Sequence, residues 1–243
     1  VAIGTDMDFD PNYPMAIRTV ASAFIRLAVH KKNRGEIAEA SELVASGLEI
    51  TRALAMRHPG ELLYRADLSI HLGHAAGIAF HAGDIAEAKE LYDTRLTINR
   101  EIHAEDPDNV SNGINLLHAF NGAALIRMND EDSSASQELY REAAQFARDL
   151  IAKAPELREP KQMLATQLNG LAYGQLRTGA HKDAVDSAEE AIAALDRLKN
   201  LDVFIRESYN TSYGYLVAAH KGLGKADADL HPIYKRMLER ALQ

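Results

Sequence analysis

The hydrophobic residues of this chain recur at intervals of three and four positions, which is the spacing of one face of an α-helix. Between positions 61 and 81, the apolar residues that share a face are Leu68, Leu72, Ala75, Ala76, Ala79 and Phe80. Between positions 84 and 104, they are Ile85, Ala88, Leu91, Tyr92, Ile98 and Ile102. The pattern therefore predicts amphipathic helices and not strands.

The hexapeptide Gly-Asp-Ile-Ala-Glu-Ala at 83–88 recurs along the chain with a fixed period. A near copy begins at Gly35, 48 residues earlier, and a weaker copy begins at Gly179, 96 residues later. Four prolines follow the same 48-residue period: Pro11, Pro59, Pro107 and Pro155. A period of about 20–50 residues is typical of solenoids, in which each repeat buries its apolar face against its neighbours.

Each repeat is predicted to form two antiparallel helices joined by a tight turn. The repeats are expected at 11–58, 59–106, 107–154, 155–202 and 203–243. The helices are expected near 13–32 and 36–57, 61–81 and 84–104, 109–128 and 133–153, 159–177 and 182–198, and 203–221 and 231–242. The predicted fold class is an all-α, right-handed superhelical solenoid of about five helical hairpins, one repeat domain over 11–243.

Residues 1–10 fall outside the period and are interpreted as a linker or extended tail that arrives from an upstream domain. Chain termini are commonly held by few contacts, which favours this interpretation over a metal site at the alternating aspartates Asp6, Asp8 and Asp10. The chain begins with valine, so we expect it to be a fragment or a processed product.

Two sequence features support the predicted hairpins. Glycine stands at 35, 83 and 179, where a first helix must end and the chain reverse, a position that favours positive φ, and Asp84 follows Gly83 as an N-cap. A column of small residues at the 48-residue period lets the paired helices approach closely; it contains Ala28, Ala76, Ala124 and Ala172. The third turn departs from the pattern, because Glu131 replaces glycine in an acidic segment that we interpret as a solvated turn with a serine N-cap.

The turn and the alanine column resemble the tetratricopeptide (TPR) repeat family. Its turn pattern Gly-Asp-Tyr-x-Glu-Ala is similar to 83–88, and its aromatic residue four places later is matched by Tyr92 and Tyr140. The unit here is longer than the ordinary TPR unit of about 34 residues. A longer subclass found in bacterial multidomain signalling proteins is more similar still, with a connector like the segments 96–100 and 106–109.

The resemblance implies that the first helix of each hairpin lines a concave groove that binds a protein or peptide. The groove-facing candidates for partner binding are Phe80, His118, Asn121, Leu125, Met128, Asn169 and Tyr173. Some family members capture a C-terminal carboxylate with a lysine and asparagine clamp. Here Gly122 and Gly170 stand at the clamp asparagine position, which argues against that mode and favours a bound helix or extended segment.

Composition excludes several other functions. The net charge of −8 argues against nucleic acid as the main partner, because phosphate binding needs a basic face. No apolar run approaches the roughly 18 residues of a membrane helix. The chain has no cysteine, which fits a cytoplasmic location and excludes disulfides and cysteine zinc sites. Nothing in the sequence predicts the oligomeric state.

No catalytic motif is present, so the chain is predicted not to be an enzyme. It has no cysteine nucleophile, no Gly-x-Ser-x-Gly elbow and no phosphate-binding loop, and no cofactor is expected. Asp67, His71 and His74 share one helix face at a spacing that can hold a divalent ion, with His118 as a further ligand. A polar stripe is the preferred interpretation of these residues, and a metal-dependent enzyme is the third hypothesis, after an interaction module and a groove that senses a small molecule or peptide.

Overall fold

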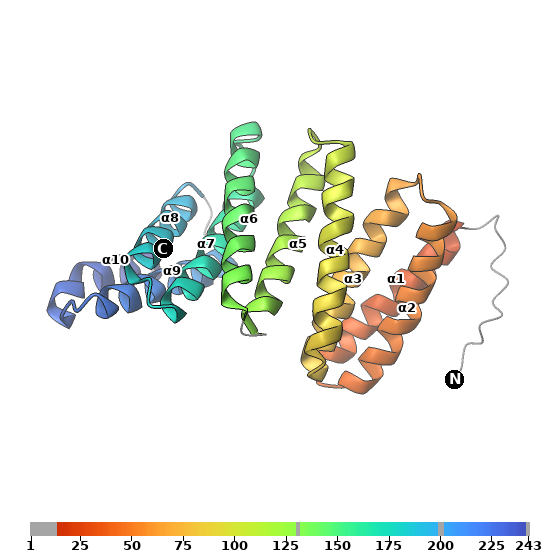
Figure 1. Ribbon diagram of the computed structural model, residues 1–243, viewed down its shortest axis with the longest axis horizontal. Coiled ribbons are helices and arrows are strands. Elements are labelled where there is room, and N and C mark those ends of the chain that lie inside the picture. Colours follow the sequence, from red (N-terminus) through yellow and green to blue (C-terminus); the bar gives the residue numbers. More distant parts are fainter. Residues whose placement is uncertain (1–13, 130–131, 199–201, 242–243) are drawn as a thin grey trace. The chain divides into compact units, whose positions relative to one another are not determined.

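The computed structural model describes residues 14–129, 132–198 and 202–241, and this part of the chain is helical with short connections (Figure 1). The helices are α1 (Pro14–Asn33), α2 (Ile37–Arg57), α3 (Leu62–Ala82), α4 (Ile85–Glu105), α5 (Val110–Asn129), α6 (Ser133–Lys153), α7 (Glu159–Arg177), α8 (His181–Asp196), α9 (Val203–Gly222), the 3-10 helix η1 (Asp227–Leu230) and α10 (His231–Ala241). The bounds of α6 and α7 are those predicted, and the other α-helices lie within two residues of the prediction at each end. The helix η1 was not predicted.

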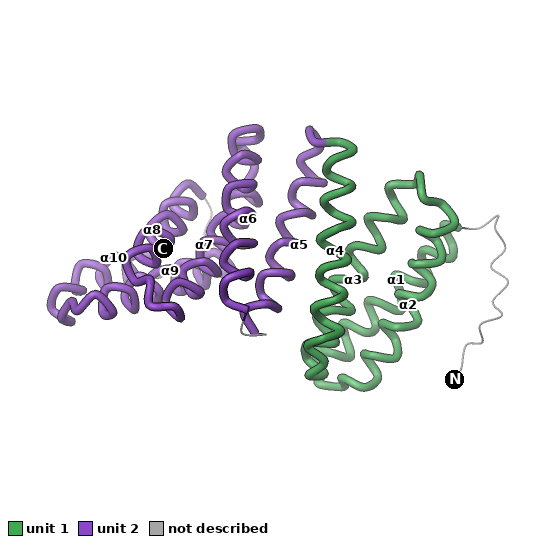
Figure 2. Tube along the Cα trace, viewed as in Figure 1, with its two compact units in different colours: residues 1–106 green, residues 107–243 purple. Residues whose placement is uncertain are grey.

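The chain divides into two compact units, residues 1–106 with α1–α4 and residues 107–243 with α5–α10 (Figure 2). Within each unit, consecutive helices pack against each other as antiparallel hairpins. The odd-numbered helices also touch, α1 against α3 in the first unit and α5 against α7 and α7 against α9 in the second. These contacts confirm the all-α helical-repeat architecture. The single continuous repeat domain over 11–243 stays a prediction.

The second turn shows how the repeated motif ends one helix and starts the next. Gly83 adopts a φ of +86°, and its N–H donates to the carbonyl of Phe80 at 3.1 Å. The N–H of Asp84 donates to the carbonyl of Ala79 at 2.9 Å, so two carbonyls left open at the end of α3 are satisfied. The Asp84 carboxylate then accepts from the N–H of Glu87 at 2.9 Å and caps α4. The predicted turn is therefore confirmed.

Replacing Gly83 by alanine is expected to lower the free energy of unfolding by about 1–2 kcal/mol, because a Cβ disfavours the left-handed backbone region. A Cβ at this position would meet no atom within 4 Å, so the expected cost is conformational and not steric. Gly60 is the matched control, since a Cβ there also meets nothing within 4 Å and its φ is not in the left-handed region. Urea denaturation followed by circular dichroism measures both variants, and equal stabilities for them would contradict the assignment.

The third turn corrects one prediction. The N-cap of α6 is Asp132 and not a serine, because its carboxylate accepts from the N–H of Ala135 at 3.2 Å. A carboxylate at this end of a helix also interacts favourably with the helix dipole. Glu131, which replaces the turn glycine, lies outside the described residues.

The alanine column lies between the paired helices, as predicted. Ala28, Ala76, Ala124 and Ala172 are each 0% exposed. In the hairpin of α5 and α6, the hydroxyl of Ser136 donates to the carbonyl of Ala124 at 2.8 Å, which requires the two backbones to lie close together. Larger residues flank this seam, among them Phe120, whose ring centroid lies 6.4 Å from that of Phe146 on α6.

Candidate functional site on the odd-numbered helices

The odd-numbered helices of the second unit expose a continuous strip of side chains. On α5 the exposed residues Ser111, His118 and Leu125 are spaced by seven, which places them on one face. On α7, partly exposed Thr166 and exposed Tyr173 follow the same spacing. Because α7 contacts both α5 and α9, these strips lie on adjacent helices. We call this surface, with Asn121 of α5 and Tyr215 of α9, the odd-helix face of unit 2.

The centre of this face is apolar and aromatic. Leu125 is 47% exposed and Tyr173 is 41% exposed. The ring of Tyr173 lies 5.9 Å from that of Tyr215 on α9, at an interplanar angle of 37°. Burial, and secondarily the neighbouring Tyr173, raise the pKa of Tyr215, so its hydroxyl stays protonated and able to donate a hydrogen bond. The pair therefore combines a broad apolar area with two polar groups.

A buried tyrosine of α6 packs against α7 beneath this face. Tyr140 of α6 is 3% exposed, and a Cβ at Gly170 of α7 would overlap its ring. The glycine in the Asn-Gly pair at 169–170 thus gives Tyr140 the space to pack against α7, and the pair does not form a turn. Burial raises the pKa of Tyr140, and the nearby Tyr215 raises it further.

The structure places five of the seven candidate residues at or near the surface. His118, Leu125 and Tyr173 are exposed and Asn121 is partly exposed, all on the odd-helix face of unit 2. The imidazole Nε2 of His118 lies 3.3 Å from a carboxylate oxygen of Glu159 at the start of α7. Phe80 is partly exposed, but it lies on α3 in the first unit.

Met128 and Asn169 were wrongly predicted to face a groove. Met128 is 4% exposed and packs in a buried cluster with Ala124, Tyr140 and Leu171. Asn169 is 8% exposed, and its carbonyl oxygen accepts from the hydroxyl of Ser212 on α9 at 2.8 Å. Its amide is therefore used inside the fold, because a buried amide must be hydrogen-bonded to avoid a desolvation penalty.

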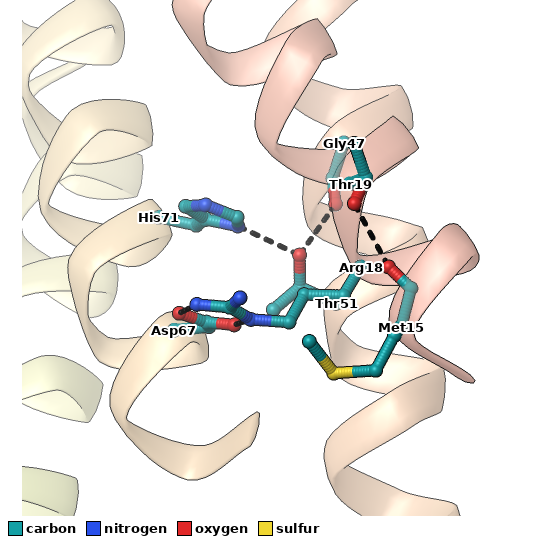
Figure 3. Close-up of polar contacts among 7 residues, drawn as sticks. All are labelled: Met15, Arg18, Thr19, Gly47, Thr51, Asp67 and His71. Atoms are coloured by element: carbon teal, nitrogen blue, oxygen red, sulfur yellow. Dashed lines mark hydrogen bonds and ion pairs between the residues drawn. The ribbon is translucent and has the colours of Figure 1, made fainter. Parts of the chain in front are cut away.

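Two of the candidate metal ligands, Asp67 and His71, contact side chains of the first hairpin (Figure 3). Asp67 of α3 receives two hydrogen bonds from the guanidinium of Arg18 on α1, the Nη2–Oδ1 distance being 3.1 Å. His71 is buried, and its Nδ1 lies 2.7 Å from the hydroxyl oxygen of Thr51 on α2. Because the Thr51 hydroxyl donates to the carbonyl of Gly47 at 2.8 Å, His71 must be the donor in the histidine contact.

These contacts argue against Asp67 and His71 as metal ligands, and the burial of His71 also corrects the preferred interpretation of a polar stripe on the groove or solvent side. Asp67 neutralises an arginine, and the inward nitrogen of His71 carries a proton. The space among Arg18, Thr51, Tyr64, Asp67 and His71 is too small to hold a water molecule. Among the described residues, no three histidine, aspartate or glutamate side chains gather where they could hold a metal ion.

Burial lowers the pKa of His71 to about 4, partly opposed by the carboxylate of Asp67. The imidazole is therefore neutral near pH 7, which suits a buried hydrogen-bond donor. A histidine in a helical sequence does not indicate such a role, because its partner Thr51 lies 20 residues away in another hairpin.

No family model matches the sequence, and no curated protein matches it. Solved structures are nevertheless similar over nearly the whole chain. A variant of the "nearly identical TPR-like repeats" of a putative kinesin light chain from Podosopora anserina is 19% identical with a TM-score of 0.60, covering 94% of this chain and 95% of that one. BtubC (BKLC) from P. vanneervenii is 17% identical with a TM-score of 0.58, covering 94% and 90%. The fold is TPR-like.

The TPR-like fold explains why the odd-numbered helices contact one another within each unit, since they are the first helices of stacked hairpins. In the described part of the chain, none of the helices has both the length and the apolar character needed to cross a membrane.

Proposed function

We propose that this chain is a non-catalytic module that binds a protein or peptide on the odd-helix face of unit 2. The observation that supports the proposal is the group formed by exposed Leu125 and Tyr173 with partly exposed Tyr215, on three adjacent helices. Aromatic side chains with a hydroxyl are favoured at binding surfaces, because they bury a large area and still hydrogen-bond at the tip. His118 and Asn121 add polar groups beside this apolar centre.

The charge of the chain supports a protein or peptide as the partner. The net charge of −8 disfavours nucleic acid and leaves protein segments as the natural ligand. We propose in addition that the module works in the cytoplasm as part of a bacterial signalling or regulatory protein. That context is supported by the similarity of the 48-residue unit to the longer TPR subclass.

A small molecule or short peptide is the second candidate ligand, and a groove in the first unit favours it. The groove has a volume of about 630 Å³ and lies between α2 and α4 over α3. Its apolar lining includes Val44, Leu48, Ile78 and Leu91, and charged residues such as Glu49 and Arg52 stand beside them. Pockets that bind small molecules commonly have volumes of about 300–1,000 Å³.

The double variant Leu125→Ala, Tyr173→Ala is expected to weaken partner binding at least about tenfold, because truncating a central anchor typically costs about 2 kcal/mol or more. The partner is first recovered with the full chain in a pull-down, and its affinity is then measured by calorimetric titration. Circular dichroism checks that the double variant keeps its helix content.

Phe204→Ala is the matched control, because Phe204 is 75% exposed on the same unit but lies at the first turn of α9. We expect this variant to bind as the parent does. Undiminished affinity in a folded double variant would rule out the odd-helix face of unit 2 as the site. Loss of affinity in the control instead would move the site to the start of α9.

A further inference from the structure

Arg95 interrupts a column of small buried residues. At the 48-residue period, the matching positions on the second helices of the other hairpins are Gly47, Ala143 and Ala191, all of them buried. Arg95 of α4 is partly buried at the same position. A large charged side chain has therefore replaced a small one in the seam between paired helices.

A glycine on the facing helix makes room for this arginine. A Cβ at Gly73 of α3 would lie 2.9 Å from the central guanidinium carbon of Arg95, so the guanidinium rests against the bare backbone. In the first hairpin the glycine is on the second helix and the large side chain is on the first. A Cβ at Gly47 of α2 would lie 3.0 Å from the end of the Ile25 side chain on α1. An aliphatic side chain opposite a glycine is thus enough to fill this position. Packing therefore does not require the charge of Arg95.

The guanidinium of Arg95 has no counter-charge among the described residues. Its Nε is buried without a hydrogen-bond acceptor, and burial lowers its pKa. Three other partly buried arginines are paired with carboxylates: Arg18 with Asp67, Arg65 with Glu101 and Glu105, and Arg148 with Glu190. A desolvated cation without a partner is costly, and a ligand that supplies the negative charge would remove this cost.

Further donors stand near Arg95. His74 follows Gly73 on α3, and its pKa is lowered by burial first, then by Arg95 and by Lys32 of α1. The hydroxyl oxygen of Tyr92, one turn before Arg95 on α4, would lie 3.9 Å from a Cβ at Gly77. The carboxylate of Asp67, which lies one turn before His71 on α3, is already paired with Arg18. The surroundings therefore offer hydrogen-bond donors and positive charge.

We propose that Arg95, His74 and Tyr92 form a binding site for an oxyanion, either a carboxylate or a phosphate group, on the second hairpin. A guanidinium donates two parallel hydrogen bonds to either group, and Gly73 holds it in place for that contact. The site belongs to the first unit and is independent of the odd-helix face of unit 2. It adds an anionic group to the ligands of this chain.

The Nε–H signal of Arg95 in nitrogen-15 NMR tests the site directly on the full chain. Sodium phosphate and sodium acetate are titrated separately against sodium chloride at equal ionic strength. We expect a saturating shift of the Arg95 signal with one of the two oxyanions and none with chloride. Saturation by phosphate identifies a phosphate site, and saturation by acetate alone identifies a carboxylate site. No shift with either oxyanion overturns the proposal.

Two variants separate binding from folding. Arg95→Gln should weaken binding of the responding anion at least about tenfold, since a hydrogen bond to a charged group contributes roughly that factor or more. Arg57→Gln on α2 is the matched control, because Arg57 is exposed, and the anion affinity of this variant should equal that of the parent. Gly73→Ala keeps the charge but displaces the guanidinium with its new methyl group, so binding should fall at least about fivefold while helicity is retained.

The pKa of His74 provides a second measure of anion binding. An anion beside the imidazole favours its charged form, so adding the responding anion should raise the pKa of His74 against the effects of Lys32 and Arg95. His71, its neighbour on α3, is held by Thr51 and should not respond. Unchanged anion affinity in both Arg95→Gln and Gly73→Ala would contradict the proposal even if the His74 signal moved.

Discussion

Replacing Phe120 by alanine is expected to lower the free energy of unfolding by about 3–5 kcal/mol, because it removes a buried aromatic side chain and leaves a cavity. Phe120 is 2% exposed on α5 and lies against Phe146 of α6. Its place next to the alanine seam makes collapse of the cavity difficult, because the paired backbones already touch there. At about 2–4 °C per kcal/mol for a chain of this size, the melting temperature should fall by roughly 6–20 °C.

Leu125→Ala on the same helix is the control for this change. Leu125 is 47% exposed, so its truncation should alter the free energy of unfolding by no more than about 0.5 kcal/mol. Thermal melts of both variants followed by circular dichroism provide the comparison. A Phe120 variant as stable as the Leu125 variant would mean that the seam of the third hairpin is not close-packed.

Acidification from pH 6.5 to 4 is expected to destabilise the fold through His71 by up to about 3 kcal/mol. Burial lowers the pKa of this imidazole from 6.5 to about 4 in the folded chain. Between these values the unfolded chain binds a proton that the folded chain does not, so stability is complete above pH 6.5 and is lost as the pH falls. The free energy of unfolding, measured by urea denaturation at half-unit steps of pH, should decline across this window.

Carboxylates in ion pairs also lose their stabilising effect on acidification, so the His71 contribution is obtained from a variant. His71→Gln keeps a donor for Thr51 but does not titrate, and its stability should decline less steeply by up to about 1.4 kcal/mol per pH unit. The same substitution at exposed His30 is the control, and its curve should run parallel to that of the parent. Equal slopes for all three proteins would show that His71 is not buried in a neutral form.

The sequence alone determined the helices and their repetition, because both depend on local or periodic properties. Glycine tolerates the positive φ that a helix end requires, so the repeated hexapeptide identifies the turn at Gly83 without knowledge of the rest of the fold. The 48-residue period predicts which positions recur in each hairpin, and it identified the alanine column that proves to be 0% exposed.

The sequence predicted the candidate site only in part. Leu125 and Tyr173 are exposed as expected, but Met128 and Asn169 are buried. A helical pattern shows that residues share a face, but it does not show whether another helix covers that face. The packing of α6 on α5 decides this for Met128, and the packing of α9 on α7 decides it for Asn169.

Only the tertiary structure decided the roles of the charged and titratable side chains. Arg18 and Asp67 lie 49 residues apart, and the stacking of hairpins brings them together. The same holds for His71, whose partner is on another helix, and for Arg95, whose lack of a counter-charge can be recognised only once its neighbours are in place. The physical reason is that burial and pairing depend on contacts between hairpins, which the local periodicity of a sequence does not specify.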